Sequence, residues 1–283
     1  MKFTEAQQRR ILAIRANASA VLQESENSAA DLIASLVQRA LDDLATYIER
    51  NPTLNVDAAL QALATAIDHV TEGATDIMIA LAEEAFDVAL VSGAAALNEF
   101  GVMSPDVIQA AAQSFEADFR RDLITEGHAA WYERLSTESL NPRGPMREVI
   151  DSVGVAGESW STAAKRLANA DPEFSYLPTR NIDAYARARE IVRTESTRID
   201  NAVSVGFGES AGIKTFQNIG VGDTRQSKIC RDASNEDPKS IEEWGRSRFG
   251  APPRHPNCRC ILLGVYTGFA PDESTLQDAG VIA

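Results

Sequence analysis

The chain has 283 residues, 44% of them hydrophobic, with a formal net charge of -14 and an isoelectric point of about 4.7. This composition suits one large packed domain or two of ordinary size. An acidic chain is repelled by nucleic-acid phosphates unless a basic patch is segregated. The most basic region, residues 176–262, has 14 Lys and Arg against 11 Asp and Glu. We therefore expect no strong nucleic-acid binding.

Residues 9–100 carry apolar residues three and four positions apart, which is the periodicity of amphipathic helices. This spacing predicts a helix over RRILAIRANASAVLQ and a second helix capped by Ser28. A break at 51–53 precedes a third predicted helix over 56–70, and Gly73 is expected to separate it from a fourth over 75–100.

The middle of the chain continues the helical pattern. Ser104 is a predicted N-cap, with Pro105 at the first helical position. The composition of 136–145 predicts a loop and a domain boundary. We expect shorter helices over 146–153 and 159–170, and a long helix from about 179 to 206.

The texture changes after Gly212, where IKTFQNIGV and CILLGVY predict short β-strands. We therefore predict a predominantly α-helical α+β protein, with a long helical N-terminal part and a small C-terminal α+β module that contains a short β-sheet. The expected division is a helical domain over 1–140, linking helices over 141–175, the module over 176–270 and a tail over 271–283.

The number of cysteines and the distribution of apolar residues indicate the expected cellular compartment. Three cysteines cannot all form intrachain disulfides. The segment MKFTEAQQRRILAI lacks the apolar core of a signal peptide, and the most apolar stretch, VALVSGAAAL, is about half a membrane span. We expect no membrane contact and synthesis in a reducing cytoplasm, where clustered Cys and His favour metal over disulfide.

The segment APPRHPNCRC, residues 251–260, is the strongest chemical signal. Zinc prefers four ligands in a tetrahedron, usually Cys thiolates and His nitrogens. In an extended backbone, side chains two positions apart point the same way, so Cys258 and Cys260 can bind one ion. With His255 and the distant Cys230 they form a candidate structural zinc site. The flanking prolines reduce the entropy lost when the segment takes a fixed shape.

The same residues also have an ordinary structural interpretation. Cys260 precedes a strand and could be a buried strand residue, since free cysteine is among the most buried residue types. His255 could cap a turn, and Cys230 could be a core thiol. The segment lacks the His-x-Glu and Pro-Cys-x-x-Cys of zinc deaminases, and the chain contains no His-Glu-x-x-His. We therefore predict no enzymatic activity.

The helix ending in IVRTESTRIDNAVSV carries Arg193, Thr194 and Glu195. Taken alone, these residues fit a solvated helix face whose i,i+4 pairs contribute about 0.3 kcal/mol each. Taken in order, the IVRTE helix, GDTRQSKICRD and PPRHPNCRCILL resemble the phage Mu F-like head morphogenesis family of minor head proteins. The matching residues are Arg193, Thr194, Glu195, Asp223, Arg225, Ser227, Cys230, Pro252, Pro253, His255, Pro256, Cys258, Arg259 and Cys260.

The resemblance covers residues 181–263 and implies structural work without catalysis. It implies a phage or prophage minor head protein that acts in capsid assembly at the portal vertex. Its partners would be the portal protein and other head proteins. Its location would be the virion, and the host cytoplasm during assembly. Two alternatives stay open: a toxin-like effector that carries this domain, and a zinc-stabilised cytoplasmic adaptor.

Overall fold

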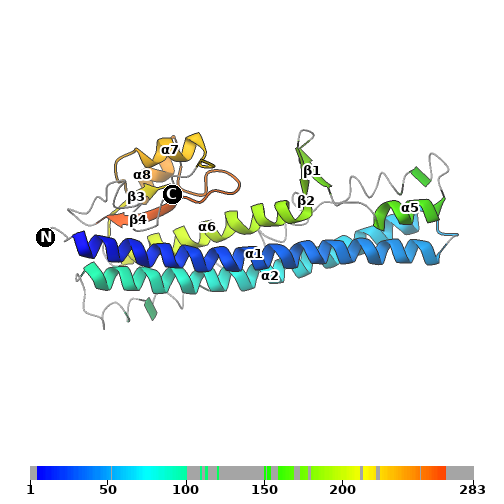
Figure 1. Cartoon of the computed structure of the whole chain (residues 1–283), viewed down its shortest axis with the longest axis horizontal. Coiled ribbons are helices and arrows are strands. Elements are labelled where there is room, and N and C mark those ends of the chain that lie inside the picture. Colours follow the sequence, from blue (N-terminus) through cyan, green and yellow to red (C-terminus); the bar gives the residue numbers. More distant parts are fainter. Residues whose placement is uncertain are drawn as a thin grey trace. The chain divides into compact units, whose positions relative to one another are not determined.

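The computed structural model describes residues 5–51, 53–100, 109, 112–113, 120, 150, 152–153, 159–168, 173–177, 180–210, 213–220, 224–248 and 250–265. These residues are predominantly helical, with long N-terminal helices and a C-terminal α+β part, which confirms the predicted fold class (Figure 1). In chain order the elements are α1 (Glu5–Arg50), α2 (Val56–Phe100), α5 (Trp160–Ala168), β1 (Glu173–Leu177), β2 (Arg180–Asp183), α6 (Ala184–Ser210), β3 (Thr215–Ile219), α7 (Lys228–Ser234), α8 (Ile241–Arg246) and β4 (Ile261–Val265).

Four helices were expected before residue 100, but the structure has two long ones there, α1 and α2, so that prediction was wrong. Ser28 lies inside α1 rather than at a helix start, and Gly73 lies inside α2. A glycine in a helix interior costs about 1 kcal/mol relative to alanine, which packing can outweigh. A Cβ at Gly73 would lie 2.9 Å from Cδ1 of Leu36 on α1. Gly73 therefore allows close approach of the two helices and does not end one.

The chain forms two compact units that are discontinuous in sequence. One contains Met1–Glu26, Leu81–Ile124 and Arg193–Ala283, and the other contains Asn27–Ala80 and Thr125–Val192. Helices α1, α2 and α6 therefore each contribute residues to both units. The division at 140, 175 and 270 stays a prediction. The predicted helix start at Ser104, the loop at 136–145 and the tail at 271–283 lie outside the described residues.

The unit built from Asn27–Ala80 and Thr125–Val192 has an apolar core between α1 and α2. Buried residues recur three and four positions apart on both helices: Ile33, Val37, Leu41, Leu44 and Ile48 on α1, and Ala59, Leu63, Ile67 and Val70 on α2. Asn55 caps α2 by accepting a 2.8 Å hydrogen bond from the backbone N–H of Ala58. The indole N–H of Trp160 on α5 donates to the Leu54 carbonyl at 2.6 Å, which ties α5 to the turn between the long helices.

Strands β1 and β2 form an antiparallel pair in this unit. Sequence reasoning missed this pair, and it placed the start of the long helix at about 179, whereas α6 begins at Ala184. Strand pairing is decided by the partner segment rather than by local periodicity, so the run from Glu173 carried too weak a signal.

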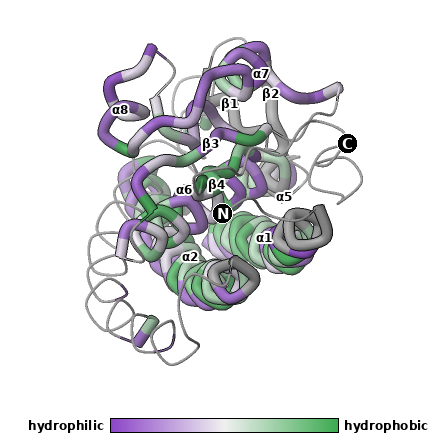
Figure 2. Tube along the Cα trace, turned by 90° about the vertical axis from the view of Figure 1, so that its left-hand side faces the viewer, coloured by the Kyte–Doolittle hydropathy of each residue, from purple (hydrophilic) through white to green (hydrophobic). Residues whose placement is uncertain are grey.

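Residues 213–265 of the other unit contain the two predicted strands. They lie within the expected module over 176–270, and the name C-terminal module refers to residues 213–265 from here on. β3 pairs antiparallel with β4, from Thr215 opposite Val265 to Ile219 opposite Ile261. α7 and α8 are mostly hydrophilic in Figure 2, whereas β4 is hydrophobic. Trp244 of α8 is fully buried, and its indole N–H donates to the Phe216 carbonyl at 2.9 Å. No helix among the described residues is long and apolar enough to cross a bilayer.

Candidate metal centre

Three of the four predicted ligands converge in the C-terminal module. The ligand atoms of Cys230, His255 and Cys258 all lie within 4.8 Å of one another. Sγ of Cys230 is 3.8 Å from Sγ of Cys258 and 3.0 Å from Nε2 of His255. A tetrahedral zinc ion with Zn–S bonds of about 2.3 Å separates two thiolates by about 3.8 Å. The sulfur pair therefore already has the spacing that zinc requires.

Cys260 adjoins this group. It is buried with Cys230 and Cys258 in one cluster of three free thiols. The four side chains together make a three-cysteine, one-histidine donor set, which suits structural zinc.

Cys230 is positioned by the start of α7. Ser227 is the N-cap of this helix, and its hydroxyl accepts a 3.3 Å hydrogen bond from the backbone N–H of Cys230. This places Cys230 in the first turn, facing the module interior, and it gives the Ser-x-x-Cys spacing a physical role. The hydroxyl of Ser227 also lies 2.8 Å from Nε2 of His255.

His255 has a defined tautomer. Its Nδ1 is 2.7 Å from the carbonyl oxygen of Pro256. A carbonyl can only accept a hydrogen bond, so Nδ1 carries a proton, and in the neutral imidazole Nε2 presents its lone pair towards Ser227 and Cys230. Metal-binding histidines generally donate their second nitrogen to a carbonyl or carboxylate in this way. The Cys258 backbone N–H donates to the His255 carbonyl at 3.1 Å, which closes a turn between these two residues.

The thiols are electrostatically unequal. Hydrogen bonds from Cys230 and Cys260 hold the pKa of Cys258 well below its usual range. Hydrogen bonds with Cys230 and Cys258, together with burial, raise the pKa of Cys260. The hydrogen bond with Cys258 likewise raises the pKa of Cys230. Cysteine binds a metal as the thiolate, so a bound cation would release the protons that the thiols carry.

One face of α6 holds the backbone of the ligand loop. The hydroxyl of Thr194 accepts a 3.0 Å hydrogen bond from the Asn257 N–H. One turn later, the hydroxyl of Thr197 donates to the Cys258 carbonyl at 2.9 Å. Asn257 has φ of 60°, a left-handed conformation that asparagine tolerates better than most residues. Thr194 and Thr197 therefore anchor the loop at its tightest turn.

Asn201 extends the same face by another turn. Its amide nitrogen donates to the Cys260 carbonyl at 3.0 Å, and its amide oxygen accepts from the Leu262 N–H at 2.6 Å. The Asn201 side chain thus donates one hydrogen bond to, and accepts one from, the backbone that leads from the cluster into β4, as a paired strand residue would. Asn201 and Thr197 were not among the predicted site residues. Their only local signal is the three-and-four spacing of Thr194, Thr197 and Asn201 on one helix face.

A second face of α6 is bound to α1 through Arg193. The Arg193 guanidinium is 3.1 Å from the carboxylate of Glu26, and the Ser196 hydroxyl donates to the same carboxylate. Glu26 and Ser196 are both buried. Arg193 therefore acts as a structural ion-pair partner and does not face the thiol cluster.

The same face contains a second buried ion pair. Nη2 of the Arg15 guanidinium donates to both carboxylate oxygens of Asp200, at 2.9 and 3.2 Å, and Nη1 donates to the Ser92 hydroxyl at 2.9 Å. Hydrogen bonds between charged partners are shorter and stronger than those between neutral groups. Sequence reasoning missed these residues because Arg15 and Asp200 are 185 positions apart.

The remaining motif residues lie outside the thiol cluster. Glu195 is buried beside Arg198, with an N–O separation of 3.5 Å. Arg225 is exposed, Arg259 is half-buried, and Asp223 lies outside the described residues.

The letters GESAG, residues 208–212, match the Gly-x-Ser-x-Gly pattern of a hydrolase nucleophile elbow. That elbow needs a sharp turn from a strand into a helix, whereas Ser210 is the last residue of α6. Its hydroxyl donates to the Phe207 carbonyl at 2.7 Å. The match therefore lacks the structural context of a nucleophile.

Comparison with protein-family models, with curated proteins and with solved structures finds no match to this chain.

Proposed function

We propose that Cys230, His255, Cys258 and Cys260 hold a structural zinc ion that closes the C-terminal module. The observation that carries this proposal is the 3.8 Å separation of two buried thiols from segments 28 residues apart. The His255 tautomer supports it, because Nε2 carries the lone pair that a cation could bind in place of the Ser227 hydroxyl. Four protein ligands leave no open coordination position, so the ion would cross-link the chain without activating water.

The ion would suit the size of the module. A unit of a few short elements buries little apolar surface, and small domains commonly gain stability from a bound metal. Zinc would join the start of α7 to the loop that leads into β4. Ligand binding would then contribute directly to the folding free energy of the module.

We further propose that the protein is a minor head protein that acts in phage capsid assembly at the portal vertex. This proposal rests on the resemblance of residues 181–263. It is supported by the interlocking of several motif positions in one unit: Thr194 holds the ligand loop, Ser227 caps the ligand helix, and Arg193 joins α6 to α1. These are assembly and packing roles, consistent with a structural protein.

This function predicts a portal gene beside the gene for this chain, and co-expression of the two proteins tests it. We expect a complex that survives size-exclusion chromatography, and we expect Cys258→Ser to lose the complex together with the folded module. Genes for an unrelated pathway on both sides of this one, or a portal protein that elutes separately from the intact chain, would contradict the minor head role. Either result would leave the zinc proposal standing.

Cobalt substitution tests the metal centre independently. Cobalt(II) bound to three thiolates and an imidazole in a tetrahedron has intense visible and near-ultraviolet absorption, which water-coordinated cobalt lacks. We expect this spectrum at one equivalent of cobalt and its loss when zinc is added. His69→Ala is the matched control, because His69 lies on α2 outside the cluster.

A further inference from the structure

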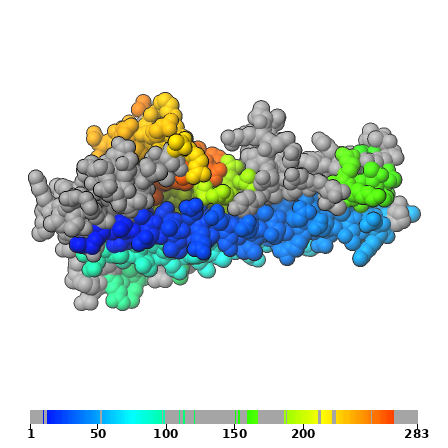
Figure 3. Space-filling view, in the orientation of Figure 1, coloured from blue at the N-terminus to red at the C-terminus, as the bar shows by residue number. Residues whose placement is uncertain are grey.

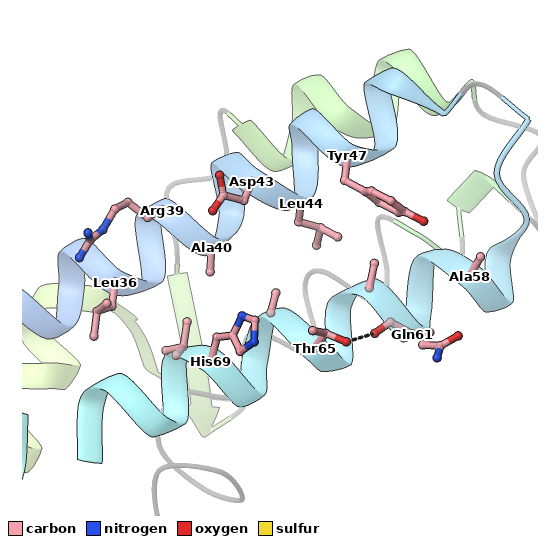
Figure 4. A pocket seen from close by; sticks show the side chains of 13 residues that line it. Leu36, Arg39, Ala40, Asp43, Leu44, Tyr47, Ala58, Gln61, Thr65 and His69 are labelled. Atoms are coloured by element: carbon pink, nitrogen blue, oxygen red, sulfur yellow. Dashed lines mark hydrogen bonds between the residues drawn. The ribbon is translucent and has the colours of Figure 1, made fainter. Parts of the chain in front are cut away.

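A groove runs along the surface between α1 and α2 in the unit that contains Asn27–Ala80. It has a volume of about 610 Å³, and Figure 4 shows side chains of both helices lining it. On the α2 side, Ala58, Ala62 and Ala66 are four positions apart and therefore lie in one row, with Gln61, Thr65 and His69 beside them. Rows of small residues allow another helix to approach closely. No described segment fills the groove.

The α1 side of the groove combines apolar and charged residues. Tyr47 is 42% exposed, although it is a large apolar side chain beside an apolar floor. Arg39 and Asp43 stand one turn apart and are both exposed. Within the described part of the chain, Asp43 has no ion-pair or hydrogen-bond partner, and Arg39 donates only to the Ser35 carbonyl of its own helix. Figure 3 shows α1, in blue, at the surface along its length.

The order of these residues is self-complementary. If two α1 helices lie antiparallel with a two-fold axis near position 41, Arg39 of each copy faces Asp43 of the other. The same register places Leu36 of each copy against Tyr47 of the other. Ala40 lies next to the axis, where the helices are closest and a small side chain is needed. All five residues line the groove.

We propose that this groove binds α1 of a second copy of the chain, which forms a two-fold dimer with four helices at its interface. Symmetric interfaces use one patch on both subunits, so each favourable contact occurs twice. The charged and apolar residues of α1 match those of an antiparallel copy of α1, and binding of an unrelated helix would not require this symmetry. Two copies of a chain with a net charge of -14 repel each other. Pairing of Arg39 with Asp43 across the interface would offset this repulsion locally.

Reversing the charges tests this register. Arg39→Asp and Asp43→Arg each convert two attractive contacts into two repulsive ones, and we expect each variant to dissociate about a hundredfold more readily than the unaltered dimer. An equimolar mixture of the two variants restores both contacts, as does the double variant. Sedimentation equilibrium should therefore show a dimer for the unaltered chain, monomers for each single variant, and a one-to-one heterodimer for the mixture.

Asp42→Arg is the matched control, because Asp42 is exposed on the same helix but does not line the groove. We expect this variant to stay dimeric, and circular dichroism should show unchanged helicity for all variants. A chain that is monomeric up to its solubility limit would overturn the proposal. So would a dimer that tolerates both single reversals, or a mixture that fails to form the heterodimer.

Discussion

The α1–α2 pair and the C-terminal module are stabilised by different means. Between α1 and α2, rows of Ile, Leu, Val and Ala side chains supply the contact, and glycine at position 73 brings the helices close. In the module, three buried thiols and one imidazole lie together at a loop that threonine and asparagine side chains of α6 also hold in place. The first arrangement is spread over many weak contacts, whereas the second depends on a few residues. Single substitutions should therefore have much larger effects in the module.

Loss of one ligand should have the largest effect. Cys258→Ser removes a thiolate from the proposed zinc site, and structural zinc sites contribute folding free energy directly, so we expect the module to unfold. Hydrogen exchange followed by mass spectrometry should show lost protection in peptides from 213–265 and little change within residues 27–80. Equal loss in both regions would contradict the separation between them.

Breaking a buried ion pair should have the next largest effect. Asp200→Ala leaves the Arg15 guanidinium buried without its carboxylate, which costs about 3–5 kcal/mol. Urea denaturation should show this change in the free energy of unfolding. Arg198→Ala is the matched control on the same helix, since its ion pair with Glu195 is partly exposed and should contribute about 1 kcal/mol or less. Similar losses for the two variants would argue against the buried pair as a joint between α6 and α1.

Removing the Asn201 amide should have a smaller but distinct effect. Asn201→Ala leaves the buried Cys260 carbonyl and Leu262 N–H without their partner, at a cost of about 1–3 kcal/mol. Asn201→Asp keeps the acceptor for Leu262 and loses the donor to Cys260. If the loop clamp also orders the ligands, chelator should remove zinc faster from Asn201→Ala than from the unaltered chain. An unchanged rate of zinc release would mean that Asn201 contributes to the stability of the module and does not order the ligands.

The smallest effect is expected at the start of α8. Ser240 and Glu243 form a capping box, in which each side chain bonds the backbone N–H of the other residue. Ser240→Ala should cost about 1 kcal/mol in thermal or denaturant unfolding of the module. Ser240→Thr keeps the hydroxyl and should restore most of this stability. If Ser240→Ala destabilised the module as much as Cys258→Ser, the larger contribution to stability assigned to the ligands would be contradicted.

The two regions were also predictable from sequence to different degrees. Apolar periodicity indicated the helices before residue 100, but it could not show that Gly73 lies within one helix, because that depends on Leu36 of the other. The β3 and β4 strands were predicted, whereas the β1–β2 pair was missed. The ligand set was identified from its chemistry. The residues that support it, Thr197 and Asn201, depend on contacts about 60 positions away that leave little local pattern.

The zinc content of the untagged protein is the most direct test of the central claim. Inductively coupled plasma mass spectrometry should find one zinc ion per chain after purification without added metal, and close to none in Cys258→Ser. Ser227→Ala, which changes a neighbour of His255 but no ligand, should retain zinc. An unaltered chain that is folded and free of metal would contradict the account, and the thiol cluster would then be an ordinary buried core.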